Sequence, residues 1–329
     1  MPQTSLLISH FNDSAGLRKC IESILSSAEH DFEIAIFDDG SSNAEKNQLS
    51  DINRLDKRIR IIFGESNRGC GYGFDQLSRE ANGEILHYVG ADDLVHPRRV
   101  ADAVEFHEAN KYYGYPDEKV PLLATGYRHL DHNYKLLANA ERQIYSHEEI
   151  QSIMFFFTPI AHGTISIPRI AYENLSPYPS DRRAGVDYLF YCKNNDILRY
   201  NYIDRKRYYI RLKNKSLTRS PNSRREQLHS HDLGMQHLWS RVLGSVEIRD
   251  ITLIRRLCIS RDDHDSPVLA ITSDQSQKIM TLLNDFQNLN QRNRYLTQLI
   301  EGAKQAVSQY QKNFSRHFSE GCSDNIILF

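Results

Sequence analysis

Two adjacent carboxylates, Asp92 and Asp93, follow a short apolar run in the stretch YVGADDLVHP. Like charges side by side repel each other unless a cation or a hydrogen-bond network takes up the charge. One interpretation is a helix N-terminus, which favours acidic residues in its first turn. The other is a divalent metal site, because Mg²⁺ and Mn²⁺ sites combine a few protein carboxylates with substrate phosphate oxygens. These two residues alone leave both interpretations open.

Three further stretches carry groups that could bind or react. Asp38 and Asp39 in FDDGSS end an apolar run and could accept hydrogen bonds from a base or a ribose, or simply form a turn. The glycine-rich stretch NRGCGYGFD, which runs from Asn67 to Asp75 and includes Gly69, precedes a helical pattern and could direct N–H groups toward a phosphate, or be a plain connector. Asp187 in GVDY could act as a general base or cap a helix.

Basic residues concentrate between positions 205 and 225, interleaved with tyrosine, serine and threonine. This pattern favours an anion-binding strand and loop, with a solvated surface as the alternative. The formal net charge of -1 argues for a small phosphate ligand over nucleic acid.

The elements that must position these groups alternate between strand and helix over the first hundred residues. The pattern predicts strands at 4–10, 32–42, 58–65 and 84–93, and helices at 16–27 and 71–83. Such alternation is typical of a parallel sheet with helices on its faces. Ligands bind at the carboxyl ends of the strands in such sheets. The stretches SHFND, DDGS and GADD all fall at those ends.

The remaining chain carries a more mixed pattern. It predicts helices at 98–111 and 185–195, a strand followed by a turn at 121–131, a strand running into a basic loop at 205–218, and a strand followed by a helix at 162–175. After residue 225 the chain reads as helical, with apolar stripes that include Leu283, Phe286 and Ile300. These stripes indicate either a helical cap or a surface for self-association or membrane contact.

Composition bounds the class of protein. The chain has 329 residues, of which 40% are hydrophobic and 25% charged, as in ordinary globular proteins. Its five cysteines include no CxxC pair, which indicates reduced thiols and a cytoplasmic location. We expect no secretory signal and no membrane-spanning helix, so that any membrane contact is peripheral.

Taken in order, LLISHFN, FDDGSS, NRGCGYG, GADD, GVDY and IRLKNKSLT resemble the family 2 glycosyltransferases, inverting enzymes with the GT-A fold. The resemblance covers roughly Thr4 to Thr218 and is most specific in the N-terminal half. It implies an α/β fold, a Rossmann-like and mostly parallel sheet flanked by helices, with a C-terminal helical extension. The implied domains are a catalytic domain at 1–224, with a nucleotide-binding half at 1–100 and an acceptor-binding half at 101–224, and a helical region at 225–329.

The resemblance also implies roles for single residues. Asp187 falls on the family's catalytic base, and Asp93 on its metal ligand. The donor-binding positions that it implies, together with the glycine-rich stretch, are Ser9, Phe11, Asp38, Asp39, Asn67, Gly69, Asp92, Arg211 and Lys213. Gly90 stands where the family often has an acidic residue, and Val186 where a glutamate often precedes the base.

The implied activity is transfer of a sugar, with inversion, from a nucleotide sugar to a hydroxyl of a glycan or lipid-linked glycan. The expected donor is a UDP-sugar or a dTDP-sugar, the expected cofactor Mn²⁺ or Mg²⁺, and the expected setting bacterial surface polysaccharide synthesis at the inner face of the membrane. We expect no nucleic-acid partner. Two alternatives stay open: a metal-dependent nucleotidyltransferase, and a nucleotide-sugar binding module without catalysis.

Overall fold

The structure, a computed structural model, describes residues 2–115, 117–137, 145–212, 221–258, 273–289 and 294–319. The chain divides into two units. The first unit is formed by residues 1–151 and 158–231, and the second by residues 152–157 and 232–329. Position 224, where we expect the catalytic domain to end, lies inside helix α7 (Pro221–Leu243). The functional division of the chain stays a prediction.

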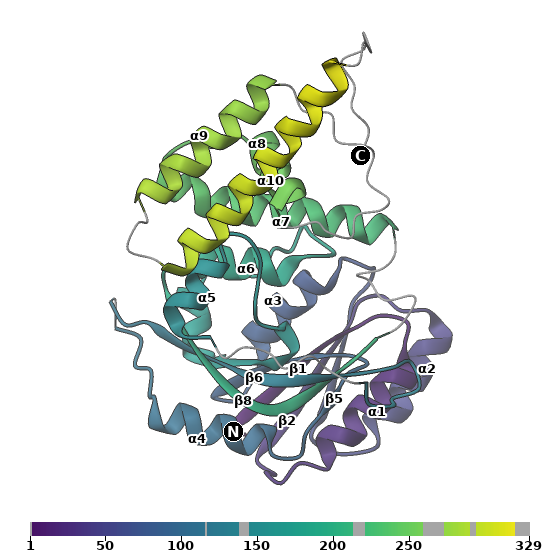
Figure 1. Cartoon of the computed structure of the whole chain (residues 1–329). Coiled ribbons are helices and arrows are strands. Elements are labelled where there is room, and N and C mark those ends of the chain that lie inside the picture. The colour runs from purple at the N-terminus through teal and green to yellow at the C-terminus, as the bar shows by residue number, and fades with distance from the viewer. Residues whose placement is uncertain are drawn as a thin grey trace. The chain divides into compact units, whose positions relative to one another are not determined.

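A mixed sheet forms the frame of the first unit. Within the described residues it has eight strands in the order β3-β2-β1-β4-β7-β6-β8-β5 (Figure 1). Parallel pairs join β1 to β2 and β4, β2 to β3, and β6 to β8, whereas β7 runs antiparallel between β4 and β6. The strands are β1 (Thr4–His10), β2 (Phe32–Asp38), β3 (Ile59–Phe63), β4 (Ile85–Gly90), β5 (Leu94–Val95), β6 (Val120–Leu130), β7 (Ile165–Pro168) and β8 (Leu198–Arg211).

Helices cover both faces of this sheet, so the predicted fold class is confirmed. In Figure 1, α1, α2 and α4 lie on one side of the sheet and α3 and α6 on the other. The helices of the first unit are α1 (Ser14–Leu25), α2 (Asn43–Asn53), α3 (Cys70–Glu80), α4 (Arg99–Ala109), α5 (His147–Ile153) and α6 (Val186–Asn194).

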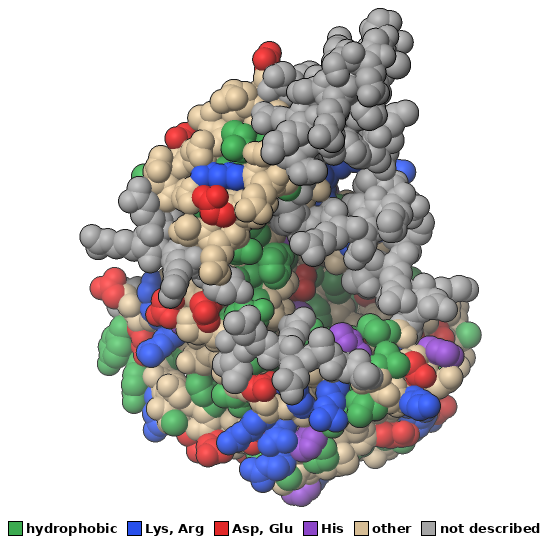
Figure 2. All heavy atoms as spheres, in the orientation of Figure 1, with side chains coloured by type: hydrophobic (Ala, Val, Ile, Leu, Met, Phe, Trp, Pro, Cys, Tyr) green, Lys and Arg blue, Asp and Glu red, His purple; other side chains and the backbone are tan. Residues whose placement is uncertain are grey.

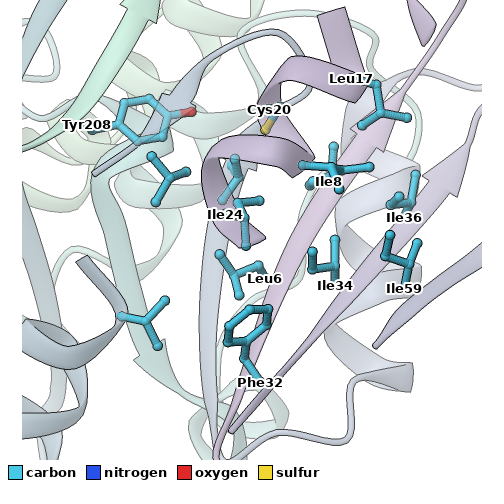
Figure 3. Close-up of a cluster of buried hydrophobic side chains, with 14 of the residues drawn as sticks. Leu6, Ile8, Leu17, Cys20, Ile24, Phe32, Ile34, Ile36, Ile59 and Tyr208 are labelled. Carbon is cyan, nitrogen blue, oxygen red and sulfur yellow. The ribbon is translucent and has the colours of Figure 1, made fainter. Parts of the chain in front are cut away.

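The core under α1 explains why the first strands are nearly continuous apolar runs. Leu6 and Ile8 of β1 pack with Ile34 and Ile36 of β2 and with Ile24 of α1, all fully buried (Figure 3). A strand that is covered on both faces has no side that can carry polar residues, except where it ends. The polar residues are therefore left at the carboxyl ends of the strands.

Several elements differ from the sequence prediction. Helices α2 and α5 were not predicted, and β8 begins at Leu198 instead of residue 205. The helix expected within 162–175 is wrong as an α-helix: short 3₁₀ turns (His162–Thr164 and Arg169–Asn174) flank the four-residue β7. The second of these turns spans only six residues after Pro168, and the chain is extended again at Leu175, which leaves too short a segment for a regular α-helix.

The second unit consists mainly of helices, namely part of α7 together with α8 (Ile248–Cys258), α9 (Ser273–Leu289) and α10 (Arg294–Ser319). Its centre is Trp239, whose ring stacks on Phe286 with centroids 4.4 Å apart and whose indole N–H donates to the carbonyl of Phe155 at 2.8 Å. The predicted apolar stripes of α9 and α10 are buried at Leu283, Phe286 and Ile300. These stripes therefore form core within this unit.

Candidate functional site

The carboxyl ends of β1, β2 and β4 bring the predicted site residues together. In the parallel register Ser9 lies beside both Phe37 and Gly90, so the residues that follow these three strands share one edge of the sheet. Asp38 and Asp39 end β2, and Asp92 and Asp93 follow β4 within three residues. This convergence is what parallel topology predicts for a ligand site.

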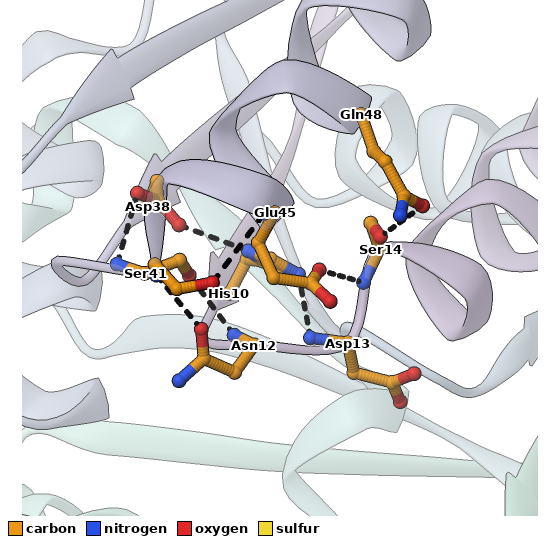
Figure 4. Close-up of polar contacts among 9 residues, drawn as sticks. His10, Asn12, Asp13, Ser14, Asp38, Ser41, Glu45 and Gln48 are labelled. Carbon is orange, nitrogen blue, oxygen red and sulfur yellow. Dashed lines mark hydrogen bonds and ion pairs between the residues drawn. The ribbon is translucent and has the colours of Figure 1, made fainter.

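A buried His10–Asp38 pair holds the loop after β1 against the loop after β2 (Figure 4). His10 Nε2 accepts the backbone N–H of Asp13 at 3.1 Å, so the proton of the neutral ring is on Nδ1, which donates to Asp38 Oδ1 at 3.1 Å. Both side chains are fully buried. Burial alone would raise the pKa of the Asp38 carboxyl, but hydrogen bonds from His10 and Ser41 lower it overall. Asp38 thus stays ionised and shapes the loop.

Further bonds in Figure 4 fix the same loop to α2. Asn12, whose φ is +50°, donates its N–H to Ser41 Oγ and accepts the N–H of Ser42. Glu45 of α2 accepts the N–H of Ser14 at 2.8 Å. The segment around Phe11, which is 46% exposed, is therefore held on both sides by hydrogen bonds while the Phe11 ring faces solvent.

Asp39 joins β2 to the glycine-rich stretch. Its carboxylate accepts the N–H groups of Arg68 and Gly69, both at 2.7 Å, and its own N–H donates to the carbonyl of His10. Burial raises the pKa of the Asp39 carboxyl above its ordinary value, against the lowering effect of these two N–H groups. Gly69 has φ +94°, and an added Cβ would lie 2.6 Å from Cα of Arg183, so only glycine fits. Arg183 also contacts Asn67, because its Nη2 donates a hydrogen bond to the Asn67 carbonyl.

Asp93 is held by two hydrogen bonds from the far strand β8. Its Oδ2 accepts the hydroxyl of Tyr208 at 2.7 Å, and its Oδ1 accepts the backbone N–H of Arg211 at 2.8 Å. Tyr208 is fully buried and its hydroxyl also accepts the N–H of Gly90 at 2.7 Å. A Cβ at Gly90 would lie 2.4 Å from Asp93 Oδ2, which explains the glycine where an acidic residue is common in the family.

A buried cation lies under this carboxylate. Arg99 of α4 is 1% exposed, its guanidinium is 4.9 Å from the centroid of the Tyr208 ring, and it donates to the carbonyls of Tyr88, Gly163 and Ile165. Burial lowers the pKa of Arg99 to about 10, so it is still protonated at neutral pH. Its positive charge favours the ionised form of a carboxylate close by.

The oxygen donors beside β4 fit a divalent cation that takes most of its ligands from elsewhere. Asp92 and Asp93 are adjacent, and the hydroxyl of Tyr208 and the backbone N–H of Arg211 orient the carboxylate of Asp93. Among the described residues no three histidine, cysteine, aspartate or glutamate side chains form a metal site. A site with one or two carboxylates is typical of Mg²⁺ or Mn²⁺ bound with substrate phosphates and water.

Asp187 lies in the first turn of α6, behind Gly185, whose φ is +69°. No described residue donates a hydrogen bond to its carboxylate, which is partly exposed. Its charge acts on the start of α3: burial raises the pKa of the Cys70 thiol to about 12, and the charges of Asp187 and Asp39 add to this effect. Asp187 and the Asp39 loop therefore approach the same end of α3.

His162, a second side chain that could accept a proton, would be a weak base. Burial lowers the pKa of its imidazole to about 4 despite the opposing charge of Asp187. Its Nδ1 lies 3.0 Å from the hydroxyl of Tyr191, and its Nε2 lies 3.4 Å from that of Tyr178. Both ring nitrogens thus have partners inside an aromatic cluster.

Of the remaining predicted residues, the structure describes Ser9 and Arg211 but not Lys213. Ser9 packs against α3, since a Cβ at Gly73 would lie 2.6 Å from its Oγ. Arg211 reaches the turn after β6, where its Nε and Nη2 donate to the carbonyl of His132 at 3.0 and 2.6 Å. Lys213 lies outside the described residues. The sequence analysis assigned no role to Tyr208, although this residue is one of the tyrosines interleaved with the basic residues of 205–225.

The chain is similar in sequence to known glycosyltransferases. The sequence profile of Glycosyl transferase family 2 matches residues 5–171, just over half of the 329 residues. A protein named as a glycosyltransferase, EpsE of Bacillus subtilis, is 28% identical over 183 residues, which are 55% of this chain and 62% of EpsE. Chondroitin synthase of Escherichia coli is 26% identical over 208 residues, which are 62% of this chain and 28% of that protein. The chain thus spans less than two thirds of either relative.

Among solved structures, S. aureus TarS 1-349 in complex with UDP-GlcNAc superimposes with a TM-score of 0.60 at 16% identity, covering 94% of this chain and 92% of that one. At this identity the likeness shows the fold alone. In the described part of the chain, every helix is too short or too polar to cross a lipid bilayer. On the face drawn in Figure 2, acidic and basic side chains are interspersed.

Proposed function

The chain belongs to glycosyl transferase family 2, and we propose that it transfers a sugar from a nucleotide sugar to a hydroxyl group of a glycan or lipid-linked glycan, with inversion at the anomeric carbon. The observation that carries this proposal is the convergence of Asp39, Asp93 and Asp187 around the carboxyl ends of the parallel strands. The three carboxylates come from β2, the segment after β4, and α6.

We propose a UDP-sugar as the donor, with a dTDP-sugar as the alternative. Support comes from the TarS structure of similar fold, which is a complex with UDP-GlcNAc. The relative named chondroitin synthase supports a polysaccharide product. We further propose a cytoplasmic enzyme that meets its acceptor at the inner face of the membrane, in bacterial surface polysaccharide synthesis.

Each residue has one proposed role in donor binding. Asp39, with the loop that it holds at Arg68 and Gly69, contacts the base and ribose beside Ser9 and Phe11. Asp93, oriented by Tyr208, and Asp92 hold the Mn²⁺ or Mg²⁺. That cation, when bound, neutralises negative charge on the leaving diphosphate. Arg211 and Lys213 add positive charge on the same side of the donor.

Asp187 is the proposed general base. No described residue blocks its carboxylate with a hydrogen bond, so an acceptor hydroxyl can approach it. Asp187 removes the hydroxyl proton as the oxygen attacks the anomeric carbon, the sugar–phosphate bond breaks, and the electron pair leaves with the diphosphate. One displacement of this kind inverts the anomeric centre.

The test is a panel of nucleotide sugars offered with and without Mn²⁺, measuring both the shift in thermal unfolding and the release of nucleoside diphosphate. A bound donor raises the unfolding temperature by mass action. An enzyme gives a shift and release with at least one donor, and Asp93→Ala abolishes the release. A shift without release would identify a binding module. Release of pyrophosphate from a nucleoside triphosphate and a sugar phosphate would identify a nucleotidyltransferase.

A further inference from the structure

A tight turn after β6 presents one tyrosine in an unusual backbone conformation. Oδ1 of Asp131 accepts the N–H groups of Asn133 and Lys135, both at 2.8 Å, and the backbone N–H of Asp131 donates to the carbonyl of Lys135. Tyr134, at the tip, has φ +65°. That region is strained for a bulky side chain, and such strain is most often kept where it serves a function.

The Tyr134 ring is contacted by two cations from other elements. Lys19 Nζ of α1 lies 4.6 Å from the ring centroid, and the guanidinium carbon of Arg211, at the end of β8, lies 4.2 Å from it. Arg211 also donates twice to the carbonyl of His132, which fixes the turn to β8. Three elements distant in the sequence thus place two positive charges around one aromatic ring.

The hydroxyl of Tyr134 has no hydrogen-bond partner among the described residues, although its oxygen is buried. A buried hydroxyl without a partner costs about 1–3 kcal/mol of stability. Burial, assisted by the charges of Asp92 and Asp13, raises the pKa of Tyr134 to about 12, against the effect of Arg211. The group is therefore a protonated donor at neutral pH, close to the carboxylates beside β4.

We propose that Lys19, Tyr134 and Arg211 form a clamp for the distal phosphate of the donor's diphosphate, with the Tyr134 hydroxyl donating a hydrogen bond to a phosphate oxygen. This inference rests on the proposed function, because it assigns residues to the diphosphate part of the same donor. A ligand oxygen would give the buried hydroxyl its missing partner, and a negative charge would relieve the repulsion between the two cations.

The surrounding charges select a phosphate over a sugar hydroxyl. A sugar hydroxyl carries no charge and gains little from two nearby cations. A phosphate would be attracted by Lys19 and Arg211 on one side and by any divalent cation bound at Asp92 and Asp93 on the other. The acidic groups whose charges act on Tyr134 are Asp92 and Asp13, and the Asp13 carboxylate also caps α1 by accepting the N–H of Gly16.

The experiment compares nucleoside diphosphates with the corresponding monophosphates by calorimetry on the full chain, using uridine, thymidine, guanosine and cytidine pairs with Mg²⁺ and with EDTA. Tyr134→Phe keeps the ring and its cation contacts but removes the hydroxyl. Lys19→Gln removes one cation. The matched controls are Tyr113→Phe and Lys57→Gln, because both residues are exposed and lie outside the clamp.

We expect wild type to bind one diphosphate more tightly than its monophosphate. Tyr134→Phe should lower that preference about tenfold or more, the effect of one lost hydrogen bond to a charged group, while monophosphate affinity and the controls are unchanged. Equal loss of diphosphate and monophosphate affinity would show a merely structural tyrosine and overturn the clamp. A wild-type chain that binds no nucleotide of the panel would overturn the proposed function as well. Normal nucleotide binding with an unchanged preference in Tyr134→Phe would overturn the clamp alone.

Discussion

Replacing Tyr208 by phenylalanine removes one oxygen from the centre of the candidate site. The ring stays in its buried position, but Asp93 loses the hydroxyl bond of 2.7 Å and the N–H of Gly90 loses its acceptor. A hydrogen bond to a charged group contributes about 1.5–3 kcal/mol, and an unsatisfied polar group costs about 1–3 kcal/mol. Because Asp93 keeps its bond from Arg211, we expect the free energy of unfolding to fall by about 3 kcal/mol.

The same change should disturb the reaction more than the fold. Residues that orient a metal-binding carboxylate typically change metal affinity or activity by about 10–100-fold when they are replaced. The matched control is Tyr200→Phe, on the same strand, which is also buried and loses one hydroxyl bond to the amide oxygen of Asn195 at 3.1 Å.

The assay has two parts, denaturant unfolding and a Mn²⁺ titration of donor turnover. We expect Tyr208→Phe to need about 10–100-fold more Mn²⁺ or to turn over that much more slowly. Tyr200→Phe should lose about 1 kcal/mol of stability and no turnover in the presence of saturating Mn²⁺. Equal Mn²⁺ dependence in wild type and Tyr208→Phe would refute the reasoning that Tyr208 orients a metal-binding Asp93.

Three further predictions concern single residues. Asp39→Ala should weaken nucleotide binding by about 1–3 kcal/mol, which calorimetry would measure, and unchanged affinity would remove Asp39 from the site. Asp187→Asn should slow turnover about 10²–10⁴-fold with donor affinity nearly unchanged, and a near wild-type rate would exclude Asp187 as the base. Burial lowers the pKa of His107 in the folded chain to about 4, below the ordinary value of about 6.5 that it has in the unfolded chain. Between about pH 4 and pH 6.5, therefore, His107 is protonated mainly in the unfolded chain. Stability should therefore rise with pH across this window, by about 3 kcal/mol for this group, and His107→Gln should flatten the curve measured by urea unfolding.

Strands β1, β2 and β4 could be predicted from the sequence because both of their faces are buried. Leu6, Ile8, Ile34 and Ile36 leave no polar position until the strand ends, so each run of apolar residues also marks where a ligand site begins. Helix α2 (Asn43–Asn53) could not be predicted in this way. It buries only Leu49 and Ile52, too few apolar residues to give a helical period.

The contacts that orient the site residues could not be predicted from the sequence, for a different reason. Tyr208 and Asp93 are 115 positions apart, and their contact depends on β8 reaching the far side of the sheet. The tautomer of His10 likewise depends on a backbone N–H that only the folded loop provides. Residue types and local spacing predict groups that bind, whereas the groups that orient them come from tertiary contacts.

The most direct measurement is proton NMR of donor breakdown in the presence of diamagnetic Mg²⁺, observed before the released sugar can equilibrate between its anomers. The prediction is that wild type releases from one nucleotide sugar a free sugar of the opposite anomeric configuration, and that Asp187→Asn releases it about 10²–10⁴-fold more slowly. Release of a sugar with retained configuration would contradict a single displacement assisted by Asp187. No release from any donor of the panel would contradict the assignment of the chain as a catalyst.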